Sequence, residues 1–276
     1  MRRPGIAPLF VMMALAGIPA TASADPVHYQ SSPARRTVAE RDWGPWLGPF
    51  RAQLEPSLMQ DFGERYLYAK ADADMKASPP APQRVVFLGD SITDRWNLAA
   101  AFPGKPYVNR GIGSQVTAQM VLRFHQDVVE LHPAAVVILA GVNDVQGFLQ
   151  QDSAEEIEAN YETMADIADR HAIRPIFASI LPVTEARSGS SNVLAERHPD
   201  ELRLLNAWLR RFCAARGYAY VDYYDALVDD KGEMRRALTD DGVHPLDAGY
   251  ALMAPVAEAA IERSLGGRVA SAPSAR

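Results

Sequence analysis

The chain has 276 residues, 48% hydrophobic and 22% charged, which fits one sizeable folded α/β domain with extensions and argues against two large domains. Its 28 Lys and Arg against 34 Asp and Glu give a net charge of −6, and this acidic balance argues against nucleic acid as a partner. The single cysteine, Cys213, rules out an intramolecular disulfide and lies in a predicted helix, as a small core residue rather than a catalytic thiol.

The first 24 residues have the pattern of a secretory signal peptide. Arg2 and Arg3 supply a positive start, an apolar run follows over 6–18, and small residues at 22 and 24 form the pattern after which signal peptidase cuts. The alternative, a transmembrane anchor, would need about 20 apolar residues, more than this run has. We therefore expect export to the periplasm or the medium, cleavage after Ala24, and no later membrane-spanning segment.

Residues 25–82 precede the main domain. Residues 25–42 are polar without periodicity, which is typical of a disordered or extended leader, whereas 43–76 contains six aromatic residues and is expected to pack on the domain as an arm or helix. A proline-rich stretch over 78–82 marks the boundary before the first strand. The predicted organisation is a signal peptide (1–24), a leader and packing arm (25–82), one catalytic domain (83–265) and a disordered tail (266–276).

From residue 84 onward, short apolar runs alternate with amphipathic stretches. The predicted strands are 84–88, 107–109, 135–140, 175–180 and 218–222. The predicted helices between and after them are 116–131, 153–171, 199–216 and 246–264. This alternation predicts a doubly wound parallel sheet with helices on both faces, in which ligands bind at the carboxyl ends of the strands. The stretch 183–199 has few apolar residues and is predicted to be a long loop beside the substrate.

The first of these strands ends at Gly89-Asp90-Ser91, before a helix-like stretch. A serine in this place would sit at a helix N-terminus, where backbone N–H groups favour developing negative charge. Ser and Asp also cap helices constantly, so this turn alone favours a helix cap over a nucleophile.

The loops after the next two strands contain possible hydrogen-bond donors. The second strand is followed by a glycine-rich turn, 109–115, but Val116 replaces the third glycine of a dinucleotide-binding fingerprint, so that interpretation is weak. The third strand is followed by Gly141-Val142-Asn143-Asp144. The Asn143 amide can donate to an oxyanion, or merely cap the next turn.

Near the end of the chain, Asp241 precedes His244 by three residues across a glycine. A carboxylate at this spacing can accept the imidazole Nδ1–H and turn Nε2 outward as a general base. The alternative for His244 alone is an ordinary histidine on a surface loop.

Together these segments resemble the GDSL family of esterases and lipases, also called SGNH hydrolases. The resemblance runs over 84–261, and its most specific elements are Gly-Asp-Ser at 89–91, Gly-x-Asn-Asp at 141–144 and Asp-x-x-His-Pro at 241–245. The branch it is most similar to contains platelet-activating-factor acetylhydrolase and bacterial acetyl- and arylesterases. The resemblance implies a flavodoxin-like three-layer α/β/α sandwich with a five-stranded parallel sheet.

Carried over by position, the resemblance implies that Ser91 is the nucleophile, His244 the base and Asp241 its orienting acid. It also implies an oxyanion hole formed by the Asn143 side chain and the backbone N–H of Ser91. Neither the residues nor the resemblance implies a metal or an organic cofactor, since the chain has no Cys/His cluster at metal-ligand spacing.

The third oxyanion donor could be either of two neighbouring residues, Gly113 or Ser114. Relatives place a glycine fourth in a Gly-Ile-x-Gly run, and here Ser114 holds that position while Gly113 stands one place earlier. We expect a backbone N–H of Ser114, or of Gly113 if the loop is shifted. Asp90, Trp96 and Val142 are weaker candidates for lining the substrate site, with surface packing as the alternative for Trp96.

The expected activity is hydrolysis of carboxylic esters with short acyl groups, for example acetyl, on a small molecule or a glycan. Two alternatives are also enzymes: a lysophospholipase or thioesterase that uses the same residues on longer acyl chains, and an acyltransferase that uses a sugar hydroxyl in place of water. A third, of a different class, is a non-catalytic flavodoxin-like or carbohydrate-binding module. The sequence leaves the natural ester and the oligomeric state open.

Overall fold

A computed structural model of the chain describes residues 44–149, 152–189 and 192–266. The predicted signal peptide and the leader up to residue 43 lie outside the described residues. So does the predicted tail from residue 267 onward.

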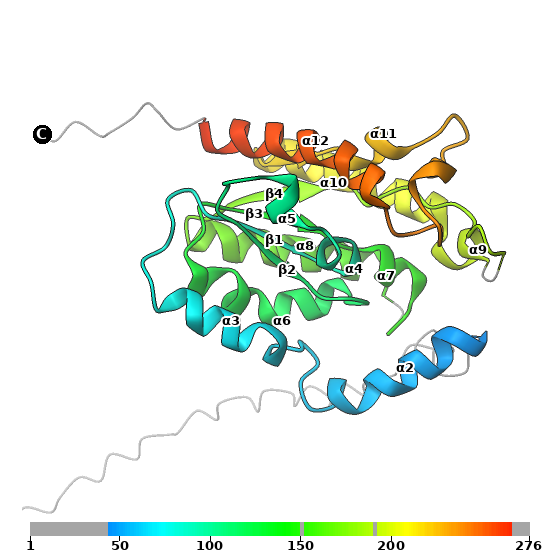
Figure 1. The fold of residues 1–276 in the computed structure, drawn as a ribbon, viewed down its shortest axis with the longest axis horizontal. Helices are drawn as coiled ribbons and strands as arrows, with labels where there is room; N and C mark the ends of the chain where they lie inside the picture. Colours follow the sequence, from blue (N-terminus) through cyan, green and yellow to red (C-terminus); the bar gives the residue numbers. More distant parts are fainter. Residues whose placement is uncertain (1–43, 150–151, 190–191, 267–276) are drawn as a thin grey trace, which may run out of the picture. The chain divides into compact units, whose positions relative to one another are not determined.

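Five parallel strands form one sheet in the order β2-β1-β3-β4-β5 (Figure 1). Their bounds are β1 (Val85–Gly89), β2 (Tyr107–Gly111), β3 (Ala135–Leu139), β4 (Arg174–Ala178) and β5 (Ala219–Val221). Each lies within two residues of its predicted position, and the predicted five-stranded α/β fold is confirmed. In the register of the sheet, Gly89 pairs with Gly111 on one side and Leu139 on the other, so three strands end at the same level.

Helices cover both faces of the sheet. The 3-10 helix η1 (Val129–Leu131) follows α6 (Thr117–Asp127), which packs against α8 (Ala154–Arg170), and α8 packs against α10 (Pro199–Arg216). On the other face, α12 (Asp247–Gly266) contacts β3, β4 and β5, with α11 (Tyr223–Leu227) and α5 (Leu98–Ala101) beside it (Figure 1). The remaining elements are α2 (Gly44–Leu58), α3 (Tyr66–Lys76), α4 (Ser91–Asp94), α7 (Val142–Gln146), α9 (Val193–Arg197) and η2 (Arg236–Leu238).

Local sequence signals account for where the long helices begin and end. Ser153 caps α8, and Ser153 and Glu156 form a reciprocal capping box. Pro199 opens α10, where its missing N–H costs nothing, and Gly217 ends it in the left-handed conformation (φ 71°). Because these signals are local, the boundaries of both helices follow the sequence closely.

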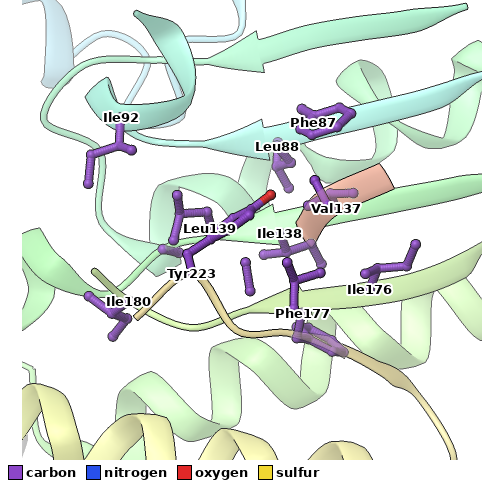
Figure 2. Close-up of a cluster of buried hydrophobic side chains, with 14 of the residues drawn as sticks. Phe87, Leu88, Ile92, Val137, Ile138, Leu139, Ile176, Phe177, Ile180 and Tyr223 are labelled. Carbon is purple, nitrogen blue, oxygen red and sulfur yellow. The ribbon is translucent and has the colours of Figure 1, made fainter. Parts of the chain in front are cut away.

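The core fills the space between the sheet and its helices. Side chains of adjacent strands, among them Leu88, Ile138 and Phe177, gather in one buried cluster (Figure 2). Burying a side chain of this size stabilises the fold by about 1.5–3 kcal/mol each. Cys213 belongs to this core, and burial raises the pKa of its thiol to about 12, so it is a poor nucleophile at neutral pH.

The segment before the sheet is helical, and α3 packs against α6 and η1. Arg110 at the end of β2 forms a buried ion pair with Asp72 of α3 (2.5 Å), and the Tyr68 hydroxyl donates to the Gly111 carbonyl (2.5 Å). These contacts hold α3 against the end of β2, close to the glycine-rich loop. In the described part of the chain, no helix is both long and apolar enough to cross a bilayer.

Candidate active site

Ser91 lies at the carboxyl end of β1 and begins α4. Asp90 caps this helix, since its Oδ1 accepts the Ile92 backbone N–H at 2.9 Å. Gly89 is required here because a Cβ in its place would lie 2.1 Å from Thr93 Oγ1 and 2.7 Å from the Leu139 carbonyl. The turn is therefore tight. It places Ser91 at the carboxyl-end edge of the sheet, where the loops after β2 and β3 also begin.

His244 is the nearest hydrogen-bonding partner of Ser91, although 153 residues separate the two. Ser91 Oγ lies 2.7 Å from His244 Nε2, and His244 Nδ1 lies 2.6 Å from Asp241 Oδ2. The other oxygen of Asp241 accepts the backbone N–H groups of Val243 (3.0 Å) and His244 (2.8 Å). This carboxylate is thus held by its own loop, and it is oriented toward the imidazole.

The charge state of Asp241 follows from these contacts. Burial alone would raise the pKa of the Asp241 carboxyl. Hydrogen bonds from the His244 ring and backbone lower it by more than burial raises it, so the pKa lies well below its usual range. Asp241 is therefore ionised at neutral pH. It can stabilise an imidazolium that forms on His244.

The loop 239–245 is shaped by Gly242, which has φ 85°. A Cβ at Gly242 would lie 2.0 Å from the Thr184 carbonyl, and the Thr184 N–H donates to the Gly242 carbonyl at 2.9 Å. The Thr239 hydroxyl accepts the Gly242 N–H at 3.0 Å. The glycine between Asp241 and His244 is thus needed for the fold of the loop and for its contact with the 181–189 segment.

The glycine-rich loop after β2 faces Ser91 from the other side. A Cβ built on Gly113 would lie 3.9 Å from the Ser91 Cβ, which places Gly113 beside the serine. Ser114 adopts φ 67°, in the left-handed region that favours glycine, whereas the φ of Gly113 is not positive. The conformation that calls for glycine therefore falls at Ser114.

Asn143 follows β3 and lies in the first turn of α7, after Gly141 with φ 105°. Its Nδ2 donates to the Gln115 carbonyl at 3.0 Å, which ties α7 to the glycine-rich loop. The next residue, Asp144, accepts the Thr117 backbone N–H (2.8 Å) and hydroxyl (2.5 Å) through Oδ1. The two loops flanking Ser91 are therefore linked to each other by buried hydrogen bonds.

Comparison with known proteins identifies the family of the chain. The profile of the GDSL-like Lipase/Acylhydrolase family matches residues 87–252. The chain belongs to this family. The resemblance inferred from the sequence segments is confirmed.

Solved structures and one curated relative extend the comparison. The chain is 32% identical to a GDSL-like lipase from Bacteroides thetaiotaomicron (TM-score 0.66), covering 74% of this chain and 99% of that one. Axe2, an acetylxylan esterase from Geobacillus stearothermophilus, shares the fold at 22% identity and TM-score 0.52, over 66% of this chain and 95% of that one. A 115-residue match at 30% identity to the lipoprotein YqeF of Bacillus subtilis covers 41% of this chain and 44% of that relative.

Within this GDSL domain, Arg123 is a buried residue that sequence reasoning missed. Its guanidinium donates to the carbonyls of Gly89 (3.0 Å) and Arg110 (2.8 Å), at the ends of β1 and β2. It also contacts the Gln115 side chain (2.6 Å) and forms an ion pair with Asp127 (2.9 Å). The i,i+4 pair of opposite charges on the apolar face of α6 was the available signal.

Three predicted lining residues do not line the site. Trp96 is 3% exposed, because its ring packs into an aromatic cluster with Phe87 and Tyr250. Asp90 is fully buried as the cap of α4, and the Val142 side chain is buried in the core. The prediction that these side chains face the substrate is wrong, because each is turned toward the interior.

The predicted long loop over 183–199 is wrong in part. Its described residues include the helix α9 (Val193–Arg197), which Asn192 caps by accepting the Ala195 N–H. Glu185 accepts the Val193 N–H at 3.0 Å. This segment does reach the site, because Arg197 donates to the Asn143 Oδ1 at 2.9 Å, a contact that the sequence did not predict. In the described ranges, no group of three or more His, Cys, Asp or Glu side chains is arranged to hold a metal ion.

Proposed function

We propose that this chain is an exported serine esterase that hydrolyses carboxylic esters with short acyl groups. Membership of the acylhydrolase family supports ester hydrolysis. The observation that carries the assignment of residues is the line of contacts from Ser91 Oγ to His244 Nε2 (2.7 Å) and from His244 Nδ1 to Asp241 (2.6 Å). A hydroxyl, an imidazole and an ionised carboxylate in this order form a nucleophile, a base and its orienting acid.

The reaction would proceed in two acyl-transfer steps. Ser91 Oγ attacks the ester carbonyl while His244 Nε2 takes its proton, and the tetrahedral oxyanion collapses as His244 returns the proton to the departing alcohol. A water molecule then gives its proton to the same nitrogen and attacks the acyl-enzyme. Collapse of the second oxyanion releases the carboxylic acid, and the proton returns from His244 to Ser91.

Three N–H groups would stabilise the oxyanion: the backbone of Ser91, the Asn143 Nδ2 and the backbone of Ser114. We favour Ser114 over Gly113 because its φ of 67° is the conformation that a glycine would normally supply in this loop. The loss of one such donor typically costs about 3 kcal/mol of barrier stabilisation, or on the order of 10²-fold in rate.

The exposure of the site supports a short acyl group. The Asp241 side chain is 50% exposed and Gly113 is exposed, so the site is open to solvent. Among the described residues near the site, the apolar side chains of Ile112, Trp96 and Val142 are buried, so these three form no apolar groove for an acyl chain. A long chain would need such a groove to leave water, which favours acetyl-like groups over the lysophospholipid and thioester alternatives.

The test is the turnover of p-nitrophenyl esters by the purified protein and by Ser91→Ala. We expect wild-type activity to be highest on acetate and to fall from butyrate to octanoate, and Ser91→Ala to be inactive while it remains folded. Ser264→Ala, at the far end of α12, is the matched control and should keep full activity. Undiminished turnover by Ser91→Ala would overturn the assignment, and a maximum at octanoate would favour the long-chain alternative. Analysis of products in the presence of a sugar would detect acyl transfer to its hydroxyl groups.

We also propose that residues 1–24 direct export and are cleaved after Ala24, and that residues 25–82 form a leader and arm on a hydrolase domain of 83–265. The charge and apolar pattern of 1–24 supports the first part. The mass of the protein recovered from a periplasmic fraction tests it: a mature N-terminus at Asp25 is expected, and an intact N-terminus in the cytoplasm would contradict it.

A further inference from the structure

Arg197 is the last residue of α9 and reaches across to α7. Its Nη1 donates to the Asn143 Oδ1 at 2.9 Å and to the Val142 carbonyl at 3.1 Å. Neither contact is local, since Arg197 lies 54 residues beyond Asn143 in the chain. One guanidinium nitrogen therefore contacts both the side chain that we propose as an oxyanion donor and the backbone just before it.

These contacts fix which end of the Asn143 amide is the donor. A guanidinium has only donor hydrogens, so the amide atom that faces it must be the oxygen. The amide nitrogen then lies on the other side, where one of its hydrogens is given to the Gln115 carbonyl at 3.0 Å. Because the amide is planar, holding its oxygen and one N–H also sets the direction of the second N–H, the one that we propose binds the oxyanion.

The element that presents Arg197 is itself tied down at two places. Glu185 accepts the backbone N–H of Val193 at 3.0 Å at the start of α9. Gln146 at the end of α7 donates to the Glu196 side chain at 3.3 Å. Arg197 thus approaches Asn143 from a helix that is anchored to the same helix α7 that carries Asn143.

The charge of Arg197 also reaches the surroundings of Ser91. Burial raises the pKa of Asp90 to about 6, and the positive charge of Arg197 is among the interactions that hold it from rising further. A cation at the amide oxygen draws electron density away from the amide nitrogen, which makes its N–H groups stronger donors.

We propose that Arg197 is a positioning residue for the oxyanion hole: it holds and polarises the Asn143 amide so that Nδ2 donates to the oxyanion. This inference rests on the proposed esterase function, because it assigns a partner to one of its donors. It predicts an effect on the chemical step rather than on substrate binding, and an effect that disappears when Asn143 is removed.

The experiment is a double-mutant cycle on p-nitrophenyl acetate hydrolysis with Arg197→Met and Asn143→Ala. Arg197→Met keeps an unbranched side chain that can pack like the arginine stem, and it removes the donors and the charge. We expect it to lower kcat about tenfold, with KM changed by less than about twofold, since orientation of one donor is lost while the site remains. In the Asn143→Ala background the same change should alter kcat by less than about twofold, because the group it positions is absent.

Two further variants make the result decisive. Arg197→Lys retains a donor and the charge and should recover part of the lost kcat, and Arg203→Met, on the exposed side of α10, should behave as wild type. Counting competent sites with a fluorophosphonate, together with the thermal midpoint, corrects each kcat for misfolded protein. Equal fold-losses from Arg197→Met with and without Asn143, or a rise in KM at constant kcat, would overturn the proposal. Either result, with Ser91→Ala still inactive, would leave the esterase assignment standing.

Discussion

The two sides of Ser91 are built in different ways. On the histidine side, Asp241 and His244 lie three residues apart, and the carboxylate is held by backbone N–H groups of its own loop and is half exposed. On the asparagine side, Asn143 is buried and is held by Gln115 and Arg197, which lie 28 and 54 residues away in the chain. The proton-transfer half of the site is thus largely local, and the oxyanion half depends on how separate elements pack.

This difference has energetic consequences. An exposed side chain held within one loop can be replaced at small cost to the fold, because few buried groups lose a partner. A buried amide in a hydrogen-bonded network cannot be replaced so cheaply, because each partner left behind becomes an unsatisfied polar group, which costs about 1–3 kcal/mol. Substitutions on the histidine side should therefore change rate alone, and those on the asparagine side should change rate and stability together.

The largest expected effect is that of His244→Ala. Removing the base should lower kcat by about 10⁴-fold or more, because the Ser91 hydroxyl is then not activated. The free energy of unfolding should fall by less than it does on a core truncation, since the His244 ring, 18% exposed, hydrogen-bonds only Asp241 of its own loop and the Ser91 hydroxyl among the contacts described above. Kinetics on p-nitrophenyl acetate and urea unfolding measure the two effects. A stability loss comparable to that of a core truncation would show that this half is not local.

Asn143→Ala should have a smaller effect on rate and a larger one on stability. Loss of one oxyanion donor is expected to lower kcat about 10²–10³-fold with little change in KM. The truncation also leaves the Gln115 carbonyl and an Arg197 donor without this partner, so we expect a loss of about 1–3 kcal/mol in unfolding free energy. The same kinetic and urea measurements apply. Wild-type stability of this variant would argue that the network is not a structural unit.

The prediction with the smallest expected effect on the rate concerns the pH dependence of stability through Asp144. Burial raises its pKa to about 7, although hydrogen bonds from Thr117 act in the opposite direction. The pKa of an aspartate in an unfolded chain is about 3.9, so the folded protein holds this proton more tightly. Its contribution to stability is therefore greatest below about pH 4, falls as the pH rises toward 7, and stays low above that.

In the Asp144→Asn variant this side chain cannot ionise, so the loss of stability between about pH 4 and pH 7 that Asp144 causes should be absent. Calorimetry at pH 5 and pH 8 should show a smaller decrease of Tm in the variant than in the wild type, with each kcal/mol worth about 2–4 °C in a domain of this size. The comparison uses the change between the two pH values, so a constant cost of the substitution cancels. Identical pH dependence in both proteins would show that Asp144 does not retain its proton in the fold.

The same contrast explains what could be predicted from the sequence. The strands and the helices α8, α10 and α12 were predicted within two residues of their bounds, helped by local signals such as Pro199 and Gly217 at the two ends of α10. The helix predicted over 116–131 is instead divided into α6 and the 3-10 helix η1. Asp241 and His244 could be paired from their three-residue spacing, and in the structure Asp241 Oδ2 contacts His244 Nδ1. The turn 89–91 was ambiguous between cap and nucleophile, and in the structure Asp90 is the cap and Ser91 faces His244.

What could not be predicted depends on tertiary packing. Trp96 lies near Ser91 in the sequence, but the aromatic cluster around Phe87 draws its ring into the core. Arg197 falls in a stretch with few apolar residues, and nothing in that stretch indicates that α9 returns to α7. The direction of a side chain and its long-range polar contacts depend on how the helices pack on the sheet. This packing cannot be read from a single sequence.

Covalent labelling determines whether Ser91 is the nucleophile. The wild-type protein is treated with a fluorophosphonate, and its intact mass, its peptide map and its residual esterase activity are followed together. We expect one adduct per chain, located on Ser91, with activity lost in proportion to labelling and no adduct on Ser91→Ala. An active enzyme that takes no label, or one labelled at another residue as its activity is lost, would contradict it.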